Sequence, residues 1–219
     1  MSANHAAFNL IFRFVENYVS PIAGRISSQR HVMAIRDGFI SAMPFMIVGS
    51  FLLVFAYPPF SPDTTWGFAR AWLDMAKQFE GQILTPFDMT MGVMSLYICA
   101  AIAYNLGKHY VKTHQLDPFM CAMLSLMAFL LVAAPKTKGA LPVDSLGGTG
   151  IFTAILVAIY CVEMMRFLKA HNIGIRLPDQ VPPMIKNSFD LLIPVLVVVL
   201  TLYPLSLLIQ SQFGMLLPQ

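Results

Sequence analysis

The chain has 219 residues, of which 57 % are hydrophobic and only 11 % are charged, and its formal net charge is +3. Soluble domains are about 45–50 % apolar and about 25 % charged, so this chain has too few polar side chains to cover a water-soluble core. The composition, with a mean hydropathy of +0.68, also excludes a disordered tail, a collagen and a disulfide scaffold. An integral membrane protein is the class that remains.

Residues 1–37 carry a stripe of apolar side chains at a spacing of three to four residues, which is typical of an amphipathic helix. Arg13 and Glu16 are among the polar side chains of the opposite face. Such a helix lies along the bilayer headgroups rather than across the bilayer. We therefore predict an interfacial segment here, and its apolar stripe consists of Phe8, Ile11, Phe12, Val15, Tyr18, Val19, Ile22 and Ile26.

Five stretches without Asp, Glu, Lys or Arg follow. Each is long enough for a helix that crosses a hydrocarbon core of about 30 Å, which takes about 20 residues. The fourth stretch can lengthen if Glu163 and Arg166 reach the interface with their side chains, and the last holds one span plus a short irregular end. The predicted fold class is all-α, a polytopic transmembrane helix bundle of about five spans. The stretches are Gly38–Tyr57, Met89–Gly107, Pro118–Pro135, Ser145–Val162 and Leu191–Gln219.

A second amphipathic stripe lies between the first two spans and predicts a second interfacial helix. Trp66 and Trp72, at its start, have two interpretations: a platform on which a sugar stacks, or anchors in the membrane interface. We favour the anchors, because tryptophan is enriched at membrane–water interfaces. The stripe is formed by Ala69, Trp72, Leu73, Ala76, Phe79 and Ile83.

Lysine and arginine residues between the spans indicate the orientation, because cytoplasmic loops carry an excess of them. The segments on the N-terminal side of the predicted membrane hold ten of these residues and the opposite side holds four. The N-terminus is therefore predicted to be cytoplasmic. A cationic cluster on that side either fixes this topology, which we favour, or contacts an anionic partner protein; it comprises Lys108, His109, Lys112 and His114.

Sequence patterns for phosphate loops, dinucleotide binding, nucleophile elbows and zinc-binding helices do not occur. The three cysteines are scattered through apolar spans and are interpreted as small buried hydrophobes. The glycine-rich segment Leu146–Gly150 is interpreted as a flexible helix entry rather than an anion site. We therefore expect no catalytic residue, no metal site and no cofactor, and a membrane-embedded enzyme is disfavoured because no paired carboxylates line a span.

The stretch Leu177–Leu192 is the richest in polar and proline residues, and it reads LPDQVPPMIKNSFDLL. Its prolines forbid regular helix, and Asn187, Ser188 and Asp190 then stand where the fifth span begins. Transporters often build a solute site from irregular backbone and polar residues at the start of such a span. A loop with a capped helix start explains the pattern equally well. Asn105, inside the second span, is likewise either functional or an interhelical hydrogen-bonding group.

Four segments of the chain carry a family resemblance. They read QRHVMAIRDGFISAMPFMIVGSF (Gln29–Phe51), MSLYICAAIAYNLGKHY (Met94–Tyr110), LDPFMCAMLSLMAFLL (Leu116–Leu131) and VPPMIKNSFDLLIP (Val181–Pro194). In this order they resemble the first three spans and the loop-to-span junction of the lactose/cellobiose/diacetylchitobiose class of phosphotransferase-system sugar permeases, the membrane component called enzyme IIC. The entry to the fourth span, Gly147–Phe152, also agrees with this class. Each segment alone is a weak signal, but the collinear set covers nearly the whole chain.

The resemblance implies a permease of the bacterial cytoplasmic (inner) membrane that carries a disaccharide or β-glucoside, such as cellobiose or chitobiose. Its partners would be the IIA and IIB phosphocarrier subunits, membrane lipid and a second copy of the chain, with no nucleic acid. Residues 38–170 would form a four-span dimerising half, and residues 171–219 the junction and the start of the sugar-transport half. Asn187 and Ser188 are the two positions expected to bind sugar.

Members of this class are longer than this chain, and the hairpins, histidine and glutamate of their later half have no counterpart here. The chain is therefore expected to be an incomplete permease that is inactive alone. The alternative is a truncated, non-transporting membrane scaffold or dimerisation module, which would form dimers in detergent and bind no sugar.

Cysteine labelling tests the predicted orientation. A single cysteine introduced at Lys138 should react with a membrane-impermeant thiol reagent added outside intact cells, whereas one introduced at Lys112 should not, because the two positions lie on opposite sides of the predicted membrane. The reverse labelling pattern would invert the topology.

Overall fold

The computed structural model describes residues 13, 16–17, 20–133, 143–175, 180, 182, 185 and 189–213. Within these residues the regular elements are all helical, which confirms the all-α fold class. They are α2 (Ser20–Ser27), α3 (Arg30–Ala56), α4 (Gly67–Thr90), α5 (Met94–His114), α6 (Pro118–Ala133), the short 3-10 turns η2 (Val143–Ser145) and η3 (Gly148–Gly150), α7 (Ile151–Ala170) and α9 (Leu192–Phe213).

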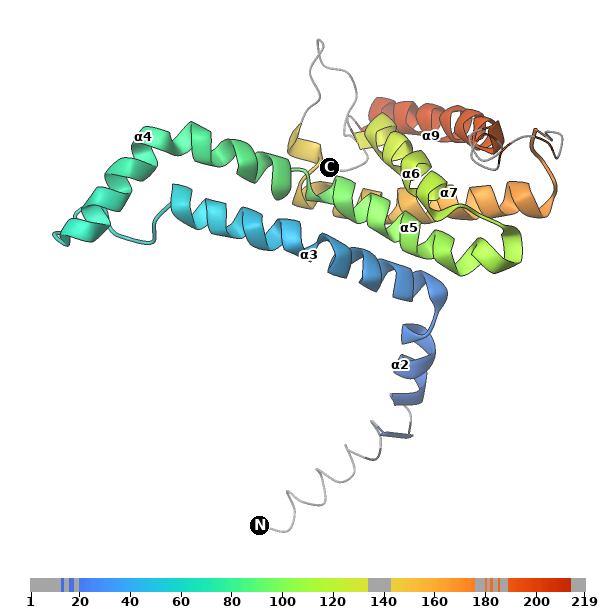
Figure 1. The fold of residues 1–219 in the computed structure, drawn as a ribbon, viewed down its shortest axis with the longest axis horizontal. Helices are drawn as coiled ribbons and strands as arrows, with labels where there is room; N and C mark the ends of the chain where they lie inside the picture. Colours follow the sequence, from blue (N-terminus) through green and yellow to red (C-terminus); the bar gives the residue numbers. More distant parts are fainter. Residues whose placement is uncertain are drawn as a thin grey trace.

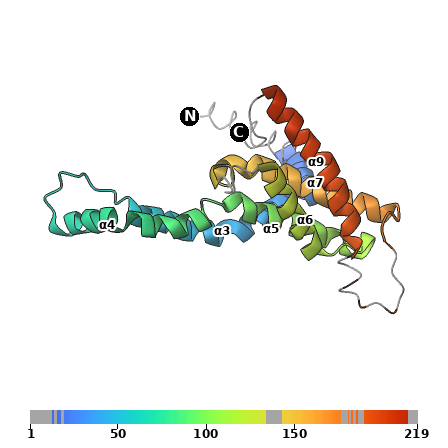
Figure 2. The ribbon, with the colours of Figure 1, turned by 90° about the horizontal axis from the view of Figure 1, so that it is seen from above.

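Helix α5 lies at the centre of the bundle, where it packs against α3, α6 and α7. Helix α9 packs on α6 and α7, and α4 runs back along the second half of α3 so that the pair extends beyond the other helices as an arm (Figures 1 and 2). Large apolar side chains face outward along the helices, and Phe51, Phe152 and Leu200 are 63 %, 80 % and 64 % exposed. A surface of this kind suits lipid rather than water.

In the part of the chain that the structure describes, four helical segments are long and apolar enough to cross a membrane: Arg30–Ala56, Gly67–His114, Gly148–Ala170 and Leu192–Gln212. These segments contain the second predicted stretch and most of the first, fourth and fifth. The third predicted stretch forms a shorter apolar helix, α6, of 16 residues. The prediction of about five apolar spans is thus confirmed, with one of them short.

The boundaries of the second predicted span, Met89–Gly107, differ from the observed helices. The chain breaks between Thr90 and Met94, and α5 then continues past the first lysine to His114. Long basic side chains allow this because their charge can reach the interface while the helix continues, and the Lys108 amine lies 4.4 Å from the Tyr104 ring centre. Helix α5 ends instead at His114, and the next residue, Gln115, has a left-handed φ of 52°.

The structure describes part of the first predicted interfacial helix and all of the second. Helix α2 turns away from the axis of α3 at the start of that helix (Figure 1), and its apolar Ile22 and Ile26 are exposed. The other members of the N-terminal stripe lie outside the described residues: Phe8, Ile11, Phe12, Val15, Tyr18 and Val19. The second stripe lies within α4 and contacts α3. The location of both helices at a membrane interface stays a prediction.

Small residues allow α3 to approach α5 closely. Ala34, Gly38 and Ala42 recur once per turn on the buried face of α3. A Cβ atom added to Gly38 would collide with the Ile102 side chain and would lie 2.9 Å from the Ile102 backbone nitrogen. Because lipid offers little hydrophobic drive for helices to associate, close backbone approach of this kind provides much of the packing energy.

Substitution of Gly38 tests this contact. We expect Gly38→Ala to lower the free energy of unfolding by about 1–3 kcal/mol, because the added methyl overpacks the α3–α5 contact. The matched control is Gly81→Ala, since Gly81 lies inside α4 with nothing within 4 Å of its added Cβ and alanine there favours helix by about 1 kcal/mol. Thermal unfolding of the purified chain in detergent, followed by circular dichroism, measures both. An equal rise in the two midpoints would contradict the close approach.

Candidate functional site

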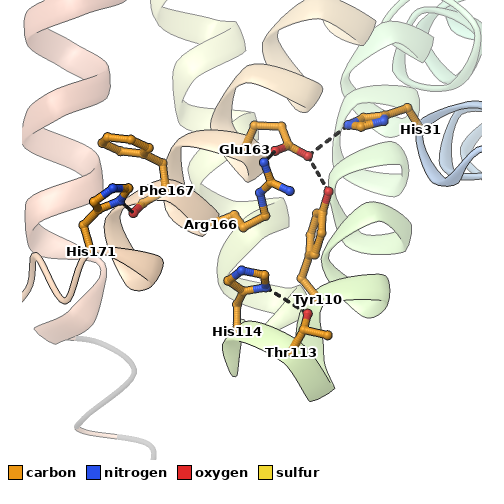
Figure 3. Close-up of polar contacts among 8 residues, drawn as sticks. All are labelled: His31, Tyr110, Thr113, His114, Glu163, Arg166, Phe167 and His171. Atoms are coloured by element: carbon orange, nitrogen blue, oxygen red, sulfur yellow. Dashed lines mark hydrogen bonds and ion pairs between the residues drawn. The ribbon is translucent and has the colours of Figure 1, made fainter.

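One carboxylate joins three helices at the end of the bundle where α3 begins and α5 and α7 end (Figure 3). Oε1 of Glu163 on α7 accepts a hydrogen bond of 2.6 Å from the Tyr110 hydroxyl on α5 and one of 2.9 Å from Nε2 of His31 on α3. Its Oε2 lies 2.8 Å from Nη2 of Arg166, one turn further along α7. We call these four residues the Glu163 network.

The local sequence places each member of this network. His31 lies in the first turn of α3, on the same face as Ala34 and Gly38, so the close α3–α5 contact brings it toward α5. Tyr110 is fully buried near the end of α5. The Glu163 side chain is only 24 % exposed, and three donors from different residues satisfy its charge, as a partly buried carboxylate requires.

Two guanidinium groups lie close to the Tyr110 ring. The Arg166 and Arg30 guanidinium carbons are 5.1 and 5.3 Å from the ring centre, within the range of cation–π attraction. The His114 ring packs edge-on against Tyr110 as well, with 5.6 Å between the centres. This end of the molecule therefore gathers positive charge around one aromatic ring and one carboxylate.

An open cavity of about 620 Å³ lies next to the network, where α5 and α7 end and α9 begins. Its polar walls include His114, Gln115, Asn172 and the ion pair between Lys169 Nζ and Asp190 Oδ2, which measures 2.6 Å. Met165, Leu168 and Pro194 add apolar surface. Donors and acceptors beside apolar patches are the surroundings that a small polyhydroxylated molecule needs.

The sequence-predicted sugar residues, Asn187 and Ser188, lie outside the described residues. Asp190, from the same junction, does line the cavity. Asn105 donates from Nδ2 to the Ala101 carbonyl of its own helix at 2.9 Å, and this bond is not the interhelical one that was one of its two open interpretations. Cys99, Cys121 and Cys161 are buried free thiols, in agreement with their interpretation as small hydrophobes.

The two tryptophans lie away from this cavity, on the arm. Trp66 and Trp72 form an edge-on aromatic cluster with Phe60 and Phe68, and the Trp72 indole donates to the Phe55 carbonyl at 3.2 Å. Tyr57, on the same arm, donates to Oε1 of Glu80 at 2.9 Å. The Glu80 carboxylate raises the pKa of the Tyr57 hydroxyl, because it accepts a hydrogen bond from the protonated hydroxyl and its negative charge disfavours the phenolate.

Sequence reasoning did not find the Glu163 network. The available signal was a glutamate and an arginine three residues apart at the end of a strongly apolar span, since ionisable residues at membrane depth tend to be paired and functional. Nothing in the sequence placed His31 or Tyr110 beside them.

Removal of the Glu163 carboxylate tests the network. We expect Glu163→Ala to lower the free energy of unfolding by about 1–3 kcal/mol, because Tyr110 and His31 lose their acceptor and Arg166 its counterion. Glu163→Gln, which keeps one acceptor oxygen, should lose less. Glu80→Gln is the control, because its partner Tyr57 is exposed and such surface contacts contribute under about 1 kcal/mol. Equal losses for Glu163→Ala and Glu80→Gln in thermal unfolding would show that the network does not join the helices.

Several known proteins are similar to this chain in sequence. The family model described as Phosphotransferase system, EIIC matches residues 36–219. The cellobiose-specific EIIC component of Geobacillus stearothermophilus is 37 % identical over 206 residues, which cover 85 % of this chain and 43 % of that protein. The lichenan permease IIC component of Bacillus subtilis is 33 % identical over 220 residues, 93 % of this chain and 46 % of that protein.

A solved structure agrees with these relatives. The crystal structure of the transporter ChbC, the IIC component of the N,N'-diacetylchitobiose-specific phosphotransferase system, matches with a TM-score of 0.77 and 32 % identity, over 94 % of this chain and 49 % of that one. The chain thus spans about half the length of the proteins that it matches. The family match over most of its residues shows that the chain belongs to the EIIC family of the phosphotransferase system.

Proposed function

We propose that this chain is part of a IIC permease that translocates a β-linked disaccharide, such as cellobiose or chitobiose, through the bacterial inner membrane. The observation that carries the proposal is the family match over residues 36–219. Relatives named for cellobiose and lichenan, and a structural relative named for diacetylchitobiose, support the substrate class. Because the chain spans about half of each relative, we propose that transport needs residues in addition to these 219.

The organisation that we propose follows the sequence expectations. Residues 38–170 form the dimerising half of a homodimer, residues 171–219 begin the transport half, and the N-terminus is cytoplasmic. IIA and IIB phosphocarrier subunits act on the cytoplasmic side. Phosphorylation of the sugar is their chemistry, and this chain contributes to binding and passage.

Asn187 and Ser188 are proposed to face the sugar. They precede Asp190, which lines the cavity between α5, α7 and α9, and an amide and a hydroxyl can each pair with sugar hydroxyls. Selectivity would then arise because a sugar that lacks the matching hydroxyl leaves a buried donor or acceptor unpaired, at a cost of about 1–3 kcal/mol.

Uptake of labelled cellobiose tests the permease proposal. In cells that lack their own cellobiose permease but contain IIA and IIB, the 219-residue chain alone should give no sugar phosphate. An in-frame fusion to the remaining part of the Geobacillus stearothermophilus relative should restore uptake. Uptake by the chain alone would contradict the need for further residues. A fusion that inserts and dimerises but binds no sugar in calorimetry would favour the alternative, a non-transporting scaffold.

Substitutions within the transporting fusion test the proposed sugar residues. Asn187→Ala should raise the half-saturating sugar concentration about tenfold, the effect of one lost hydrogen bond in a buried site. Asn105→Ala is the matched control, because the Asn105 amide bonds to its own helix, and it should leave that concentration unchanged. Equal behaviour of the two variants would remove Asn187 from the sugar site.

A further inference from the structure

The corner between α2 and α3 concentrates positive charge that its neighbours do not neutralise. Arg30 is exposed, and among the described residues no carboxylate lies within ion-pair distance of it. Arg166 and His31 share the single carboxylate of Glu163. Two guanidinium groups therefore have one carboxylate near them, and both lie close to the Tyr110 ring, at 5.3 and 5.1 Å from its centre.

The start of α3 leaves backbone N–H groups at this corner without a partner inside the helix. Helix α3 begins at Arg30 without a side-chain cap and without an acidic residue in its first turn. The first N–H groups of a helix point outward at the positive end of its dipole, and they favour phosphate and other anions. Guanidinium groups match phosphate oxygens with two parallel hydrogen bonds.

The surroundings of the corner indicate where such a phosphate comes from. Ile22 and Ile26 of α2 are 58 % and 54 % exposed, and so are Ile40 and Met43 of α3 at 55 % and 49 %. Arg30 thus lies between the exposed apolar side chains of α2 and a membrane-spanning helix that carries exposed apolar side chains of its own. A soluble anion would meet only the cations here, whereas a phospholipid would place its phosphate on them and its acyl chains on the apolar surface.

We propose that Arg30 and Arg166, positioned by Tyr110 and Glu163, bind the phosphate of an anionic phospholipid at the corner of α2 and α3. The lipid would fill the space beside α2 and attach that helix to the start of α3. The Glu163 network then has a role in addition to joining three helices, because it holds Arg166 beside the same tyrosine ring as Arg30.

Native mass spectrometry of the purified chain tests the site. The chain is released from micelles that contain phosphatidylglycerol and phosphatidylcholine in equal amounts, and the retained lipids are counted. We expect preferential retention of phosphatidylglycerol, and we expect Arg30→Gln to weaken it about fivefold or more. Lys112→Gln is the matched control, because Lys112 is an exposed cation at the same end of the bundle and lies outside the proposed site. It should retain the lipid as the unchanged chain does.

Three outcomes would overturn the proposal. Equal losses for Arg30→Gln and Lys112→Gln would mean diffuse attraction to the basic end rather than a site. Equal retention of the two lipids would mean that the protein does not recognise the charge of the headgroup. Displacement of phosphatidylglycerol by inorganic phosphate alone would mean a site for a soluble anion. Arg70→Gln, on the arm, checks that loss of any one arginine does not itself reduce lipid retention, and unchanged thermal unfolding of Arg30→Gln excludes a general loss of structure.

Discussion

Close packing of backbones around α5 is the constraint on which the other features depend. Within a membrane, apolar side chains gain little by leaving lipid for protein, so helices associate where small residues let their backbones approach. Gly38 provides this on the α3 side. Gly107 provides it toward α6, where an added Cβ would lie 3.1 Å from the Pro118 Cα. Because small residues occupy the contacts between helices, the larger apolar side chains face outward from the bundle. Much of the apolar surface is therefore exposed.

The Glu163 network follows from this packing. His31 lies on the small-residue face of α3, so the contact that seats Gly38 against Ile102 also carries His31 toward the end of α5. Tyr110 then bridges to Glu163 on α7. A carboxylate at this depth is stable only when donors surround it, and each donor depends on the position of a different helix. The network therefore forms only when α3, α5 and α7 are correctly placed relative to one another.

Composition and uncharged stretches predicted the fold class and the approximate positions of the spans because the hydrocarbon thickness fixes the length of an apolar helix. Their ends were less predictable. Helices α3 and α5 both extend through charged residues, from Arg30 and as far as His114, since basic side chains can reach the interface from within a helix. The break between α4 and α5 lies inside an apolar stretch, so counting charges could not reveal it.

The site was less predictable than the fold, because its residues come from three distant segments. Glu163 and Arg166 are visible as a pair in the sequence, but His31 is 132 residues away from Glu163 and only the packed helices bring the two together. The junction was recognised from its prolines and polar residues, and Asp190 of that junction pairs with Lys169 at the end of α7. This ion pair fixes one wall of the cavity, because it joins the end of α7 to the start of α9.

The two ends of the molecule differ in chemistry, and this difference has a physical basis. One end holds the network, the cavity and most of the histidines, whereas the arm carries Trp66, Trp72 and their phenylalanine neighbours. Aromatic rings with one polar group suit either interface, but dense positive charge is favoured on the cytoplasmic side alone. At the basic end the Lys169–Asp190 pair neutralises one of those cations and also forms part of the cavity wall, so the local charge balance and the shape of the cavity depend on the same contact.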